Sequence, residues 1–395
     1  MGGHGGDFDP ERWNRPELMS TGAINTGVMH TGLMRAAIMR NWTLEITDIA
    51  IPTPRPHQIL TRMRACGICG SDLHMLRHGA EMRAEQARLA AEDARWSSPT
   101  SEAPISTAFD PAHPTVMGHE FCCEVVDLGA QAVEINPHLA IGDLVVSYPV
   151  ALDHPSDLHT LHTVGYSNTY PGGYGEYLVL DAARTMKVPD ATPANLAALT
   201  EPLAVGIHAV AKSGIAPGEG AVVIGLGPVG LACVATMRAQ GIGPIIGADF
   251  SPARRALGEL LGCDAVVDPM HSSPMQSWNA LGGDRPVVIF EAVGVPGLID
   301  QAMRMAPRQA RVLVVGVCMQ ADHIHPMVGI GKELTVQFAL GYTSAEFALA
   351  LNWISEQVVD LAPMITDTVT IDQIPQAFEA LSDPEQQAKI LVVSD

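Results

Sequence analysis

Three separate segments in the first half of the chain contain side chains that bind transition metals. The segment Cys66–His74 contains thiols, a hydroxyl and an imidazole, and the pair His119-Glu120 and the carboxyl group of Glu201 follow later. A thiolate, an imidazole and a carboxylate that converge suit a zinc ion with one open coordination position. Spacing alone does not pair these residues, because the segments are far apart. A buried cysteine can equally be a small core residue.

The second half contains a glycine pattern that is typical of a dinucleotide site. A strand expected at Ala221–Gly225 runs into a tight turn and then a helix, and the turn contains Gly225, Gly227, Pro228, Val229 and Gly230. In this pattern the first glycine permits the turn, the second lets backbone approach a pyrophosphate, and the third lets the helix pack closely on the strand. The N-terminus of the helix then offers its free N–H groups to the phosphates.

An acidic residue follows the next expected strand, Pro244–Ala248. Asp249 is placed to accept hydrogen bonds from the ribose hydroxyls of adenosine, and a carboxylate there would repel a 2′-phosphate. Phe250, and not an arginine, comes next. The pattern predicts NAD in preference to NADP, but Arg254 and Arg255 leave NADP open.

The elements that must position these residues are of two kinds. From residue 33 to about 190 we expect short strands broken by turns, for example Leu44–Ile51, Gln58–Ala65, Phe121–Leu128 and Asp143–Ser147. From about residue 203, helices alternate with the short apolar strands already given and with Val287–Phe290 and Arg311–Gly316. Such alternation predicts a parallel sheet that is covered on both faces. The tail is predicted to hold a helix at Ala345–Glu356 and a strand at Lys389–Val393.

Four motifs occur together and in order: GICGSDLH, GHE, EPLAVGIHA and GLGPVG. The chain therefore resembles the zinc-containing medium-chain dehydrogenase/reductase superfamily, especially its alcohol and sorbitol dehydrogenases, from about residue 33 to the end. The resemblance implies an α/β protein with a GroES-like β catalytic domain over 33–203 and a Rossmann domain with a doubly wound parallel sheet over 204–342. Residues 343–395 would return to the catalytic domain, and residues 1–32 would be an N-terminal extension.

The resemblance also implies which residues hold the metal and move the proton. Cys69 and His119 would bind one catalytic zinc, together with either Glu120 or Glu201. Ser71 would contact the alcohol oxygen and His74 would pass the proton on. A hydroxyl can both donate and accept, and an imidazole titrates near neutrality. The side chain of Asp72 would orient a histidine or the ligand groups. The implied activity is hydride transfer between NAD and an alcohol, secondary or polyol-like, giving a ketone or aldehyde.

The sequence departs from the family pattern in two places. Relatives with a second, structural zinc hold it with four closely spaced cysteines, but residues 146–175 contain none. We therefore predict no structural zinc, with a substitute site at His154, His159 and His162 as the alternative. The second departure is an insertion at 79–112, which begins with the strong helix formers of Gly79–Ala94. It is expected to form a surface helix or, alternatively, a substrate lid or subunit contact.

Composition excludes several partners. The formal charge of −20 without a basic stripe argues against nucleic acid and anionic membranes. An odd, irregular set of seven cysteines favours free thiols in a reducing compartment. The sequence shows no signal peptide and no long uncharged apolar run, so a cytoplasmic protein acting on a small molecule is expected. Because oligomers are common in the family that the chain resembles, a homodimer or homotetramer is expected, with Arg311–Gly316 and the segment after it as the contact.

Three other functions compete with this interpretation. A zinc-free quinone or enoyl-type reductase of the same superfamily would lack the metal ligands. A dismutase would retain its NAD through turnover. A non-catalytic NAD-binding protein would have no use for the hydroxyl and imidazole of the expected proton relay.

Overall fold

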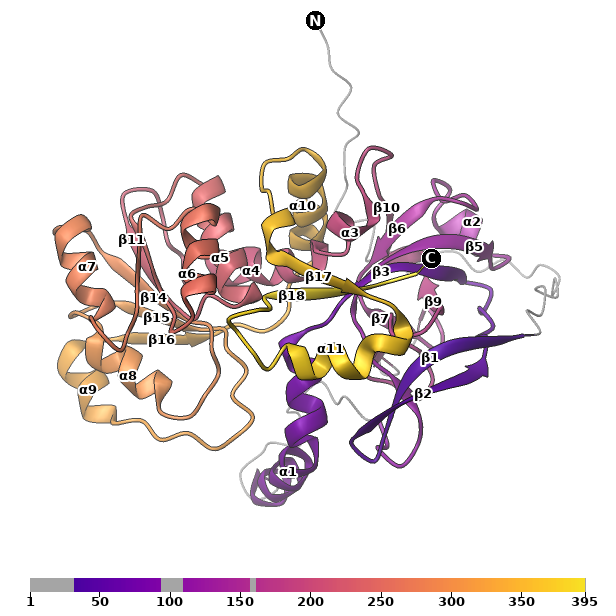
Figure 1. Cartoon of the computed structure of the whole chain (residues 1–395), viewed down its shortest axis with the longest axis horizontal. Coiled ribbons are helices and arrows are strands. Elements are labelled where there is room, and N and C mark those ends of the chain that lie inside the picture. The colour runs from indigo at the N-terminus through magenta and orange to yellow at the C-terminus, as the bar shows by residue number, and fades with distance from the viewer. Residues whose placement is uncertain (1–31, 94–108, 157–160, 395) are drawn as a thin grey trace, which may run out of the picture.

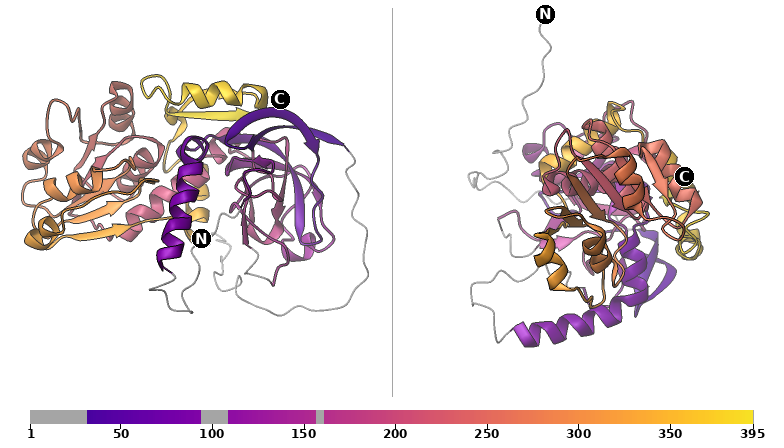
Figure 2. Two further views of the ribbon diagram at one scale, coloured as in Figure 1. Left: turned by 90° about the horizontal axis from the view of Figure 1, so that it is seen from below. Right: turned by 90° about the vertical axis from the view of Figure 1, so that its left-hand side faces the viewer.

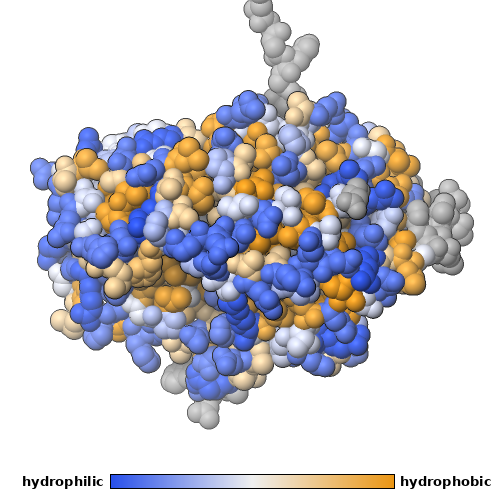
Figure 3. Space-filling model, viewed as in Figure 1, coloured by the Kyte–Doolittle hydropathy of each residue, from blue (hydrophilic) through white to orange (hydrophobic). Residues whose placement is uncertain are grey.

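The computed structural model describes residues 32–93, 109–156 and 161–394, so most of the expected N-terminal extension and part of the expected insertion lie outside it. The chain forms two halves, each built on its own large sheet, with the C-terminal elements between them (Figure 1). Polar and apolar side chains are interspersed over the face in Figure 3, which has a recess at its lower left. The α/β class predicted from the sequence is confirmed.

The first half is built mainly from antiparallel strands. Its main sheet has the order β10-β6-β5-β3-β18-β17, and β9 also pairs with β3. These strands are β3 (Gln58–Gly67), β5 (Glu120–Leu128), β6 (Leu144–Ser147), β9 (Tyr177–Asp181), β10 (Thr185–Lys187), β17 (Ile365–Val369) and β18 (Lys389–Val393). Because β18 pairs with β3, the last strand of the chain becomes part of a sheet that is otherwise built mainly from strands of the first half.

Smaller elements complete this half. A three-stranded sheet has the order β2-β1-β4, and β7 pairs with β8. The bounds are β1 (Leu33–Arg40), β2 (Thr43–Ala50), β4 (Thr115–Val116), β7 (Val150–Leu152), β8 (Leu161–Thr163), α2 (Ala132–Ile135), η2 (Ala182–Arg184) and α3 (Ala194–Ala197). The C-terminal return adds α10 (Ser344–Ser355), η3 (Ala362–Met364), η4 (Ile371–Gln373) and α11 (Ile374–Ala380).

The second half is a six-stranded parallel sheet in the order β13-β12-β11-β14-β15-β16. Its strands are β11 (Gly220–Ile224), β12 (Ile245–Ala248), β13 (Ala265–Val267), β14 (Val287–Glu291), β15 (Arg311–Val314) and β16 (Thr335–Phe338). The connecting helices are α5 (Pro228–Ala239), α6 (Pro252–Leu261), α7 (Pro274–Leu281), α8 (Leu298–Met305) and α9 (Pro326–Lys332). Strand order reverses at β11, which is where open α/β sheets bind their ligands.

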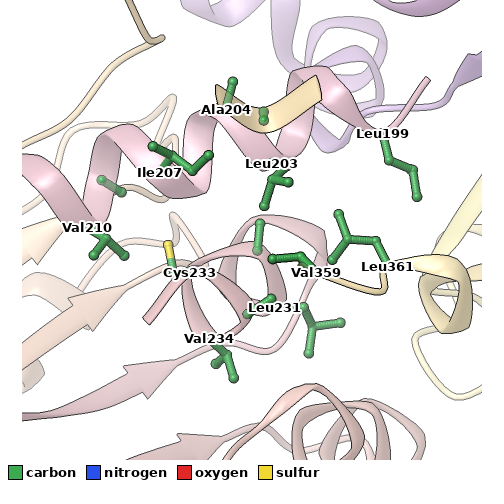
Figure 4. Packing of buried hydrophobic residues seen from close by; sticks show 14 of the residues in the cluster. Leu199, Leu203, Ala204, Ile207, Val210, Leu231, Cys233, Val234, Val359 and Leu361 are labelled. Atoms are coloured by element: carbon green, nitrogen blue, oxygen red, sulfur yellow. The ribbon is translucent and has the colours of Figure 1, made fainter. Parts of the chain in front are cut away.

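Helix α4 (Thr200–Ser213) connects the halves through their largest shared core. Leu203, Ile207 and Val210 on α4 face Leu231 and Val234 on α5 (Figure 4). The stretch Ala194–Ser213 is apolar and long enough to cross a membrane, but 67% of its apolar window is buried inside the fold. Its apolarity is therefore accounted for by the core.

The insertion lengthens a helix that already belongs to the first half. Helix α1 runs without a break over Gly70–Asp93 and projects from the body (Figures 1 and 2). A Cβ at Gly79 would lie 2.0 Å from the ring of Trp42, so this helix can cross the β1–β2 hairpin only at a glycine. The helix predicted over Gly79–Ala94 is confirmed as far as Asp93, beyond which the described residues stop, but its predicted start was wrong. Ser71 and His74 lie on the same helix.

The predicted strands and tail helix all exist, with ends displaced by one or two residues. In the second half and the tail, the strands β13, β16 and β17 were missed, because short half-exposed segments have little apolar periodicity. One consequence is a correction for subunit contacts. Strand β15 pairs with β14 on one side and β16 on the other, so its own edges are not free for a partner chain.

Candidate metal and dinucleotide sites

The thiol, the imidazole and one carboxylate expected to bind metal lie together. Cys69 immediately precedes α1, while His119 and Glu120 stand at the start of β5. Ligand atoms of these three residues lie within 4.8 Å of one another. Tetrahedral zinc with bonds of about 2.2 Å needs ligand atoms about 3.6 Å apart, and the set of sulfur, nitrogen and oxygen donors matches zinc. The site therefore fits a zinc ion after small side-chain adjustments.

Glu120 is held by a buried cation that the sequence did not single out. The ammonium group of Lys389, on β18, donates to both carboxylate oxygens of Glu120 at 2.7 and 2.8 Å and to the carbonyl of Ile68 at 3.0 Å. Both side chains are 1% exposed. Neighbouring carboxylates and the bonds to Glu120 outweigh burial, which alone would lower the pKa of Lys389, so its pKa is raised.

Glu201, in the first turn of α4, stands slightly apart from that group. It is not among the three mutually close residues, although the charges of His119, Glu120 and Lys389 all act on it. Burial raises the pKa of Glu201 to about 7. Zinc-binding cysteine is a thiolate. The thiolate of Cys69, the two carboxylates and the Lys389 ammonium together would carry a charge equal and opposite to that of a divalent cation.

The carboxylate of Asp72, fully buried in the first turn of α1, accepts hydrogen bonds from three donors. Tyr166 donates to one carboxylate oxygen at 2.6 Å, and Tyr174 and the backbone N–H of Cys69 donate to the other at 2.7 and 3.3 Å. His119 Nδ1 lies 3.5 Å from Asp72, which is too far for a hydrogen bond. Burial would raise the pKa of Asp72, but His119 and the two tyrosines hold it below its ordinary value. Asp72 is thus an ionised acceptor behind the ligands.

The two residues expected to move the proton lie one turn apart on α1. Ser71 Oγ is 3.0 Å from the hydroxyl oxygen of Tyr166. His74 is half-buried, and desolvation together with the positive charges of His78 and Arg77 lowers its pKa. Residues three apart on a helix share a face, so Ser71 and His74 are neighbours. The sequence motif carried both, but nothing in it indicated the tyrosine.

Tyr166 and Tyr174 come from the segment that lacks the cysteines of a structural zinc. This segment packs on the strand-to-strand connection next to His119: the N–H groups of Gly173 and Tyr174 donate to the carbonyls of Gly118 and Met117 at 2.8 and 3.0 Å. A Cβ on Gly165 would lie 2.9 Å from the Gly118 carbonyl oxygen. Such close backbone contact carries the two phenol groups to Asp72.

Among the described residues of this segment, no histidine cluster suited to a metal was found. His154 bonds Ser156, and His162 pairs with Asp153 at 3.2 Å. His159 lies outside the described residues. The described histidines therefore serve local hydrogen bonds.

The glycine turn has the geometry that the sequence predicted. Gly225 has φ = 91°, which favours glycine, and Pro228 is the first residue of α5. A Cβ at Gly230 would lie 2.0 Å from the carbonyl oxygen of Gly225, whereas a Cβ at Gly227 would meet nothing closer than 3.9 Å. Gly230 is thus required by the fold itself, and Gly227 leaves space beside the turn.

Asp249 follows β12 and closes this turn. Its carboxylate accepts the N–H of Leu226 at 2.8 Å and of Ser251 at 2.9 Å. Arg255 bonds the carbonyl of Asp249 at 2.8 Å and pairs with Asp268 at 3.3 Å. Arg254 points toward Gly227, and its Nε is buried without a hydrogen-bond partner. Of the two arginines, only Arg254 therefore adds unpaired positive charge beside the turn.

Comparison with known proteins agrees with this arrangement. Residues 55–190 match the family model described as alcohol dehydrogenase GroES-like domain, and residues 228–356 match that described as zinc-binding dehydrogenase. The chain is 30% identical over 363 residues to (R,R)-butanediol dehydrogenase of Bacillus subtilis, covering 88% of this chain and 96% of that protein. It is 25% identical over 350 residues to sorbitol dehydrogenase of Bos taurus, covering 85% and 89%.

A solved structure shows the same fold. The crystal structure of 2R,3R-butanediol dehydrogenase from Bacillus subtilis superposes with a TM-score of 0.74 at 29% identity, covering 92% of this chain and all (100%) of that one. The chain belongs to the zinc-containing alcohol dehydrogenase family of the medium-chain dehydrogenases. It is an NAD(P)-linked oxidoreductase of the alcohol or polyol dehydrogenase type, as the sequence predicted.

Proposed function

We propose that this protein oxidises a secondary alcohol or polyol to the ketone, using NAD and one zinc ion per chain. The observation that carries the proposal is the convergence of Cys69, His119 and Glu120 within 4.8 Å, at the end of the helix that carries Ser71 and His74. A zinc ion held there would supply Lewis acidity, which lowers the pKa of an alcohol hydroxyl. Glu201 is proposed as the second carboxylate of the site, because its charge completes the balance with a divalent cation.

The protein's own groups then receive the proton. Ser71 accepts the hydrogen bond of the alcohol hydroxyl, and His74, kept neutral by its lowered pKa, takes the proton onward. The negative charge of Asp72, 3.5 Å from His119 Nδ1, favours the ring orientation that turns this nitrogen toward the carboxylate. A nicotinamide cofactor held by the parallel-sheet half would supply the hydride acceptor.

The dinucleotide would lie along the turn that contains Gly225, Gly227, Pro228, Val229 and Gly230. The open space beside Gly227 suits the approach of a pyrophosphate, and the N-terminus of α5 offers free N–H groups. The carboxylate of Asp249 would accept hydrogen bonds from the ribose hydroxyls of adenosine. This supports NAD over NADP, because Arg255 is already engaged by Asp268, whereas Arg254 lies near the pyrophosphate turn.

The substrate class rests on the relatives. The proteins named butanediol dehydrogenase and sorbitol dehydrogenase are named for alcohols with hydroxyls on neighbouring carbons. The direct test is NADH formation across primary, secondary, aromatic and polyol alcohols, with zinc content measured on the same sample. Activity that survives complete removal of zinc, or activity toward quinones alone, would contradict the proposal.

We also propose a cytoplasmic homo-oligomer whose subunits join along β16. This edge strand and its surroundings expose the large apolar residues Met327, Ile330, Phe338 and Leu340. An unpaired strand edge beside exposed apolar side chains favours association. All seven cysteines are free, which suits a reducing compartment. Phe338→Lys should give a monomer in sedimentation analysis; an unchanged assembly would contradict this contact.

A further inference from the structure

The hydroxyl of Tyr166 lies between two groups of the site that no motif linked to it. It is 2.6 Å from Asp72 Oδ1 and 3.0 Å from Ser71 Oγ. Tyr166 is buried, and its ring lies 5.4 Å from that of His119 at an interplanar angle of 35°. It comes from the segment without structural-zinc ligands. Ser71, Tyr166 and Asp72 thus form one continuous hydrogen-bonded chain.

Counting protons fixes the direction of this chain. Ionised Asp72 can only accept, so the single hydroxyl proton of Tyr166 is committed to the shorter, charge-assisted bond. The oxygen of Tyr166 can then only accept from Ser71, and Ser71 must donate. The one proton of Ser71 is therefore directed to Tyr166, and the remaining lone pairs of Oγ are left as acceptors.

We propose that Tyr166 is a positioning residue for alcohol oxidation, because it holds Ser71 Oγ as a hydrogen-bond acceptor for the hydroxyl of the alcohol. The inference rests on the proposed function, in which Ser71 meets the substrate. Without Tyr166 the Ser71 hydroxyl would be free to rotate, and it would spend part of its time presenting its proton to the alcohol. In that arrangement Ser71 donates to the alcohol oxygen and offers no lone pair to the alcohol proton, which must pass to His74.

The chain offers a closely matched control. Tyr174→Phe removes one phenol donor from the same carboxylate as Tyr166→Phe does. Tyr174, however, bonds the other oxygen, Asp72 Oδ2, at 2.7 Å and is not hydrogen-bonded to Ser71. Both variants keep the aromatic ring, and each removes one hydrogen bond to the carboxylate of Asp72. Only Tyr166→Phe removes the partner of Ser71.

The kinetic test compares these two variants in protein with full zinc content. Tyr166→Phe should lower kcat at least tenfold more than Tyr174→Phe, within the range of about 10²- to 10⁴-fold that positioned proton transfer supplies, with KM changed by less than about threefold. Its solvent deuterium isotope effect on kcat should rise, and that of Tyr174→Phe should not. Combining Tyr166→Phe with Ser71→Ala should add little to Ser71→Ala alone. Equal losses in the two phenylalanine variants would overturn the proposal.

Two structural measurements do not depend on activity. In a crystal structure of Tyr166→Phe, Ser71 Oγ should leave its position, and in Tyr174→Phe it should stay. Neutron diffraction on the unmodified protein should find the Ser71 deuteron directed at Tyr166 and the Tyr166 deuteron directed at Asp72; the reverse assignment overturns the proposal even if no variant folds. An unmodified protein that oxidises no alcohol but shows these deuterons would instead refute the proposed function.

Discussion

Lys389 and Glu120 are 269 residues apart in the chain, yet the ammonium of one is hydrogen-bonded to both carboxylate oxygens of the other in a fully buried pair. Strand β18 brings Lys389 to β3, and β5 brings Glu120 to the opposite edge of β3. Strand β18 therefore places a positive charge directly beside the proposed metal ligands. Fold closure and the electrostatics of the site depend on the same residue.

Replacing Lys389 should destabilise the zinc-free protein strongly. Lys389→Met leaves the Glu120 carboxylate buried without a cation, and breaking a buried pair in this way costs about 3–5 kcal/mol. The exposed pair Lys187–Asp143, at 2.7 Å, provides the control: Lys187→Met should cost no more than about 1 kcal/mol. Urea unfolding after chelation measures both. Similar small losses of stability in the two variants would mean that water reaches the Glu120 carboxylate. The double variant Lys389→Met with Glu120→Gln should recover most of the stability that Lys389→Met loses.

Zinc affinity should separate the roles of the two carboxylates. Glu120→Gln removes a ligand candidate and leaves the Lys389 ammonium facing the site, so we expect it to weaken zinc binding more than Glu201→Gln does. Both should weaken zinc more than about tenfold, the lower bound for residues that support metal sites. Competition with a chelator of known affinity measures this, and the exposed Glu259→Gln is the control. Unchanged affinity in Glu201→Gln would remove that residue from the site.

Alcohol oxidation should have an acid limb set by His74. Burial first, and then the charges of His78 and Arg77, lower its pKa, so the imidazole stays neutral and able to accept a proton to below pH 6.5. Turnover controlled by this group should fall only below that value, as His74 becomes protonated. His78→Gln removes one positive neighbour, so the acid limb should move toward higher pH, and His74→Asn should abolish it. A log kcat profile that is identical in all three proteins would exclude His74 from the proton path.

The sequence was sufficient for the fold class and for the proposed ligands that the structure brings together, but not for the residues that surround them. Cys69, His119 and Glu120 were found because thiol, imidazole and carboxylate groups are rare enough for a short motif to be informative. Tyr166, Tyr174 and Lys389 were not, because a phenol in a turn and a lysine in a final strand look like ordinary surface residues. Their roles depend on β18 pairing with β3 and on backbone contact at Gly118, which no local pattern records.

Helix α1 gives the same lesson for secondary structure. The helix formers of Gly79–Ala94 predicted an independent element, because the residues before them read as a metal-binding motif. The backbone continues helically from Gly70, with Asp72 accepting the N–H of Cys69 at its first turn. Helix propensity marked the strong part of the helix, and the tertiary contacts of Asp72 extended it to the site.

The two glycines of the dinucleotide turn should respond in opposite ways to alanine. At Gly227 a Cβ would face open space, with the nearest atom, Arg254 Nη1, at 3.9 Å, and the backbone is extended. Gly227→Ala should therefore change the free energy of unfolding by no more than about 0.5 kcal/mol, in line with substitutions that disturb no contact. The added methyl group would occupy space that the pyrophosphate needs, so NAD affinity should fall sharply.

Gly230→Ala should lower the stability of the fold, whereas Gly227→Ala should lower the affinity for NAD. Its Cβ would lie 2.0 Å from the carbonyl oxygen of Gly225, and backbone cannot yield as a side chain tip can, so this variant should lose stability by about 1–3 kcal/mol as an overpacked site. Calorimetric NAD titration and thermal unfolding on both variants give the comparison. Stable Gly227→Ala protein that binds NAD normally would move the dinucleotide away from this turn. Loss of stability in Gly227→Ala would instead mean that the chain itself needs the space beside Gly227.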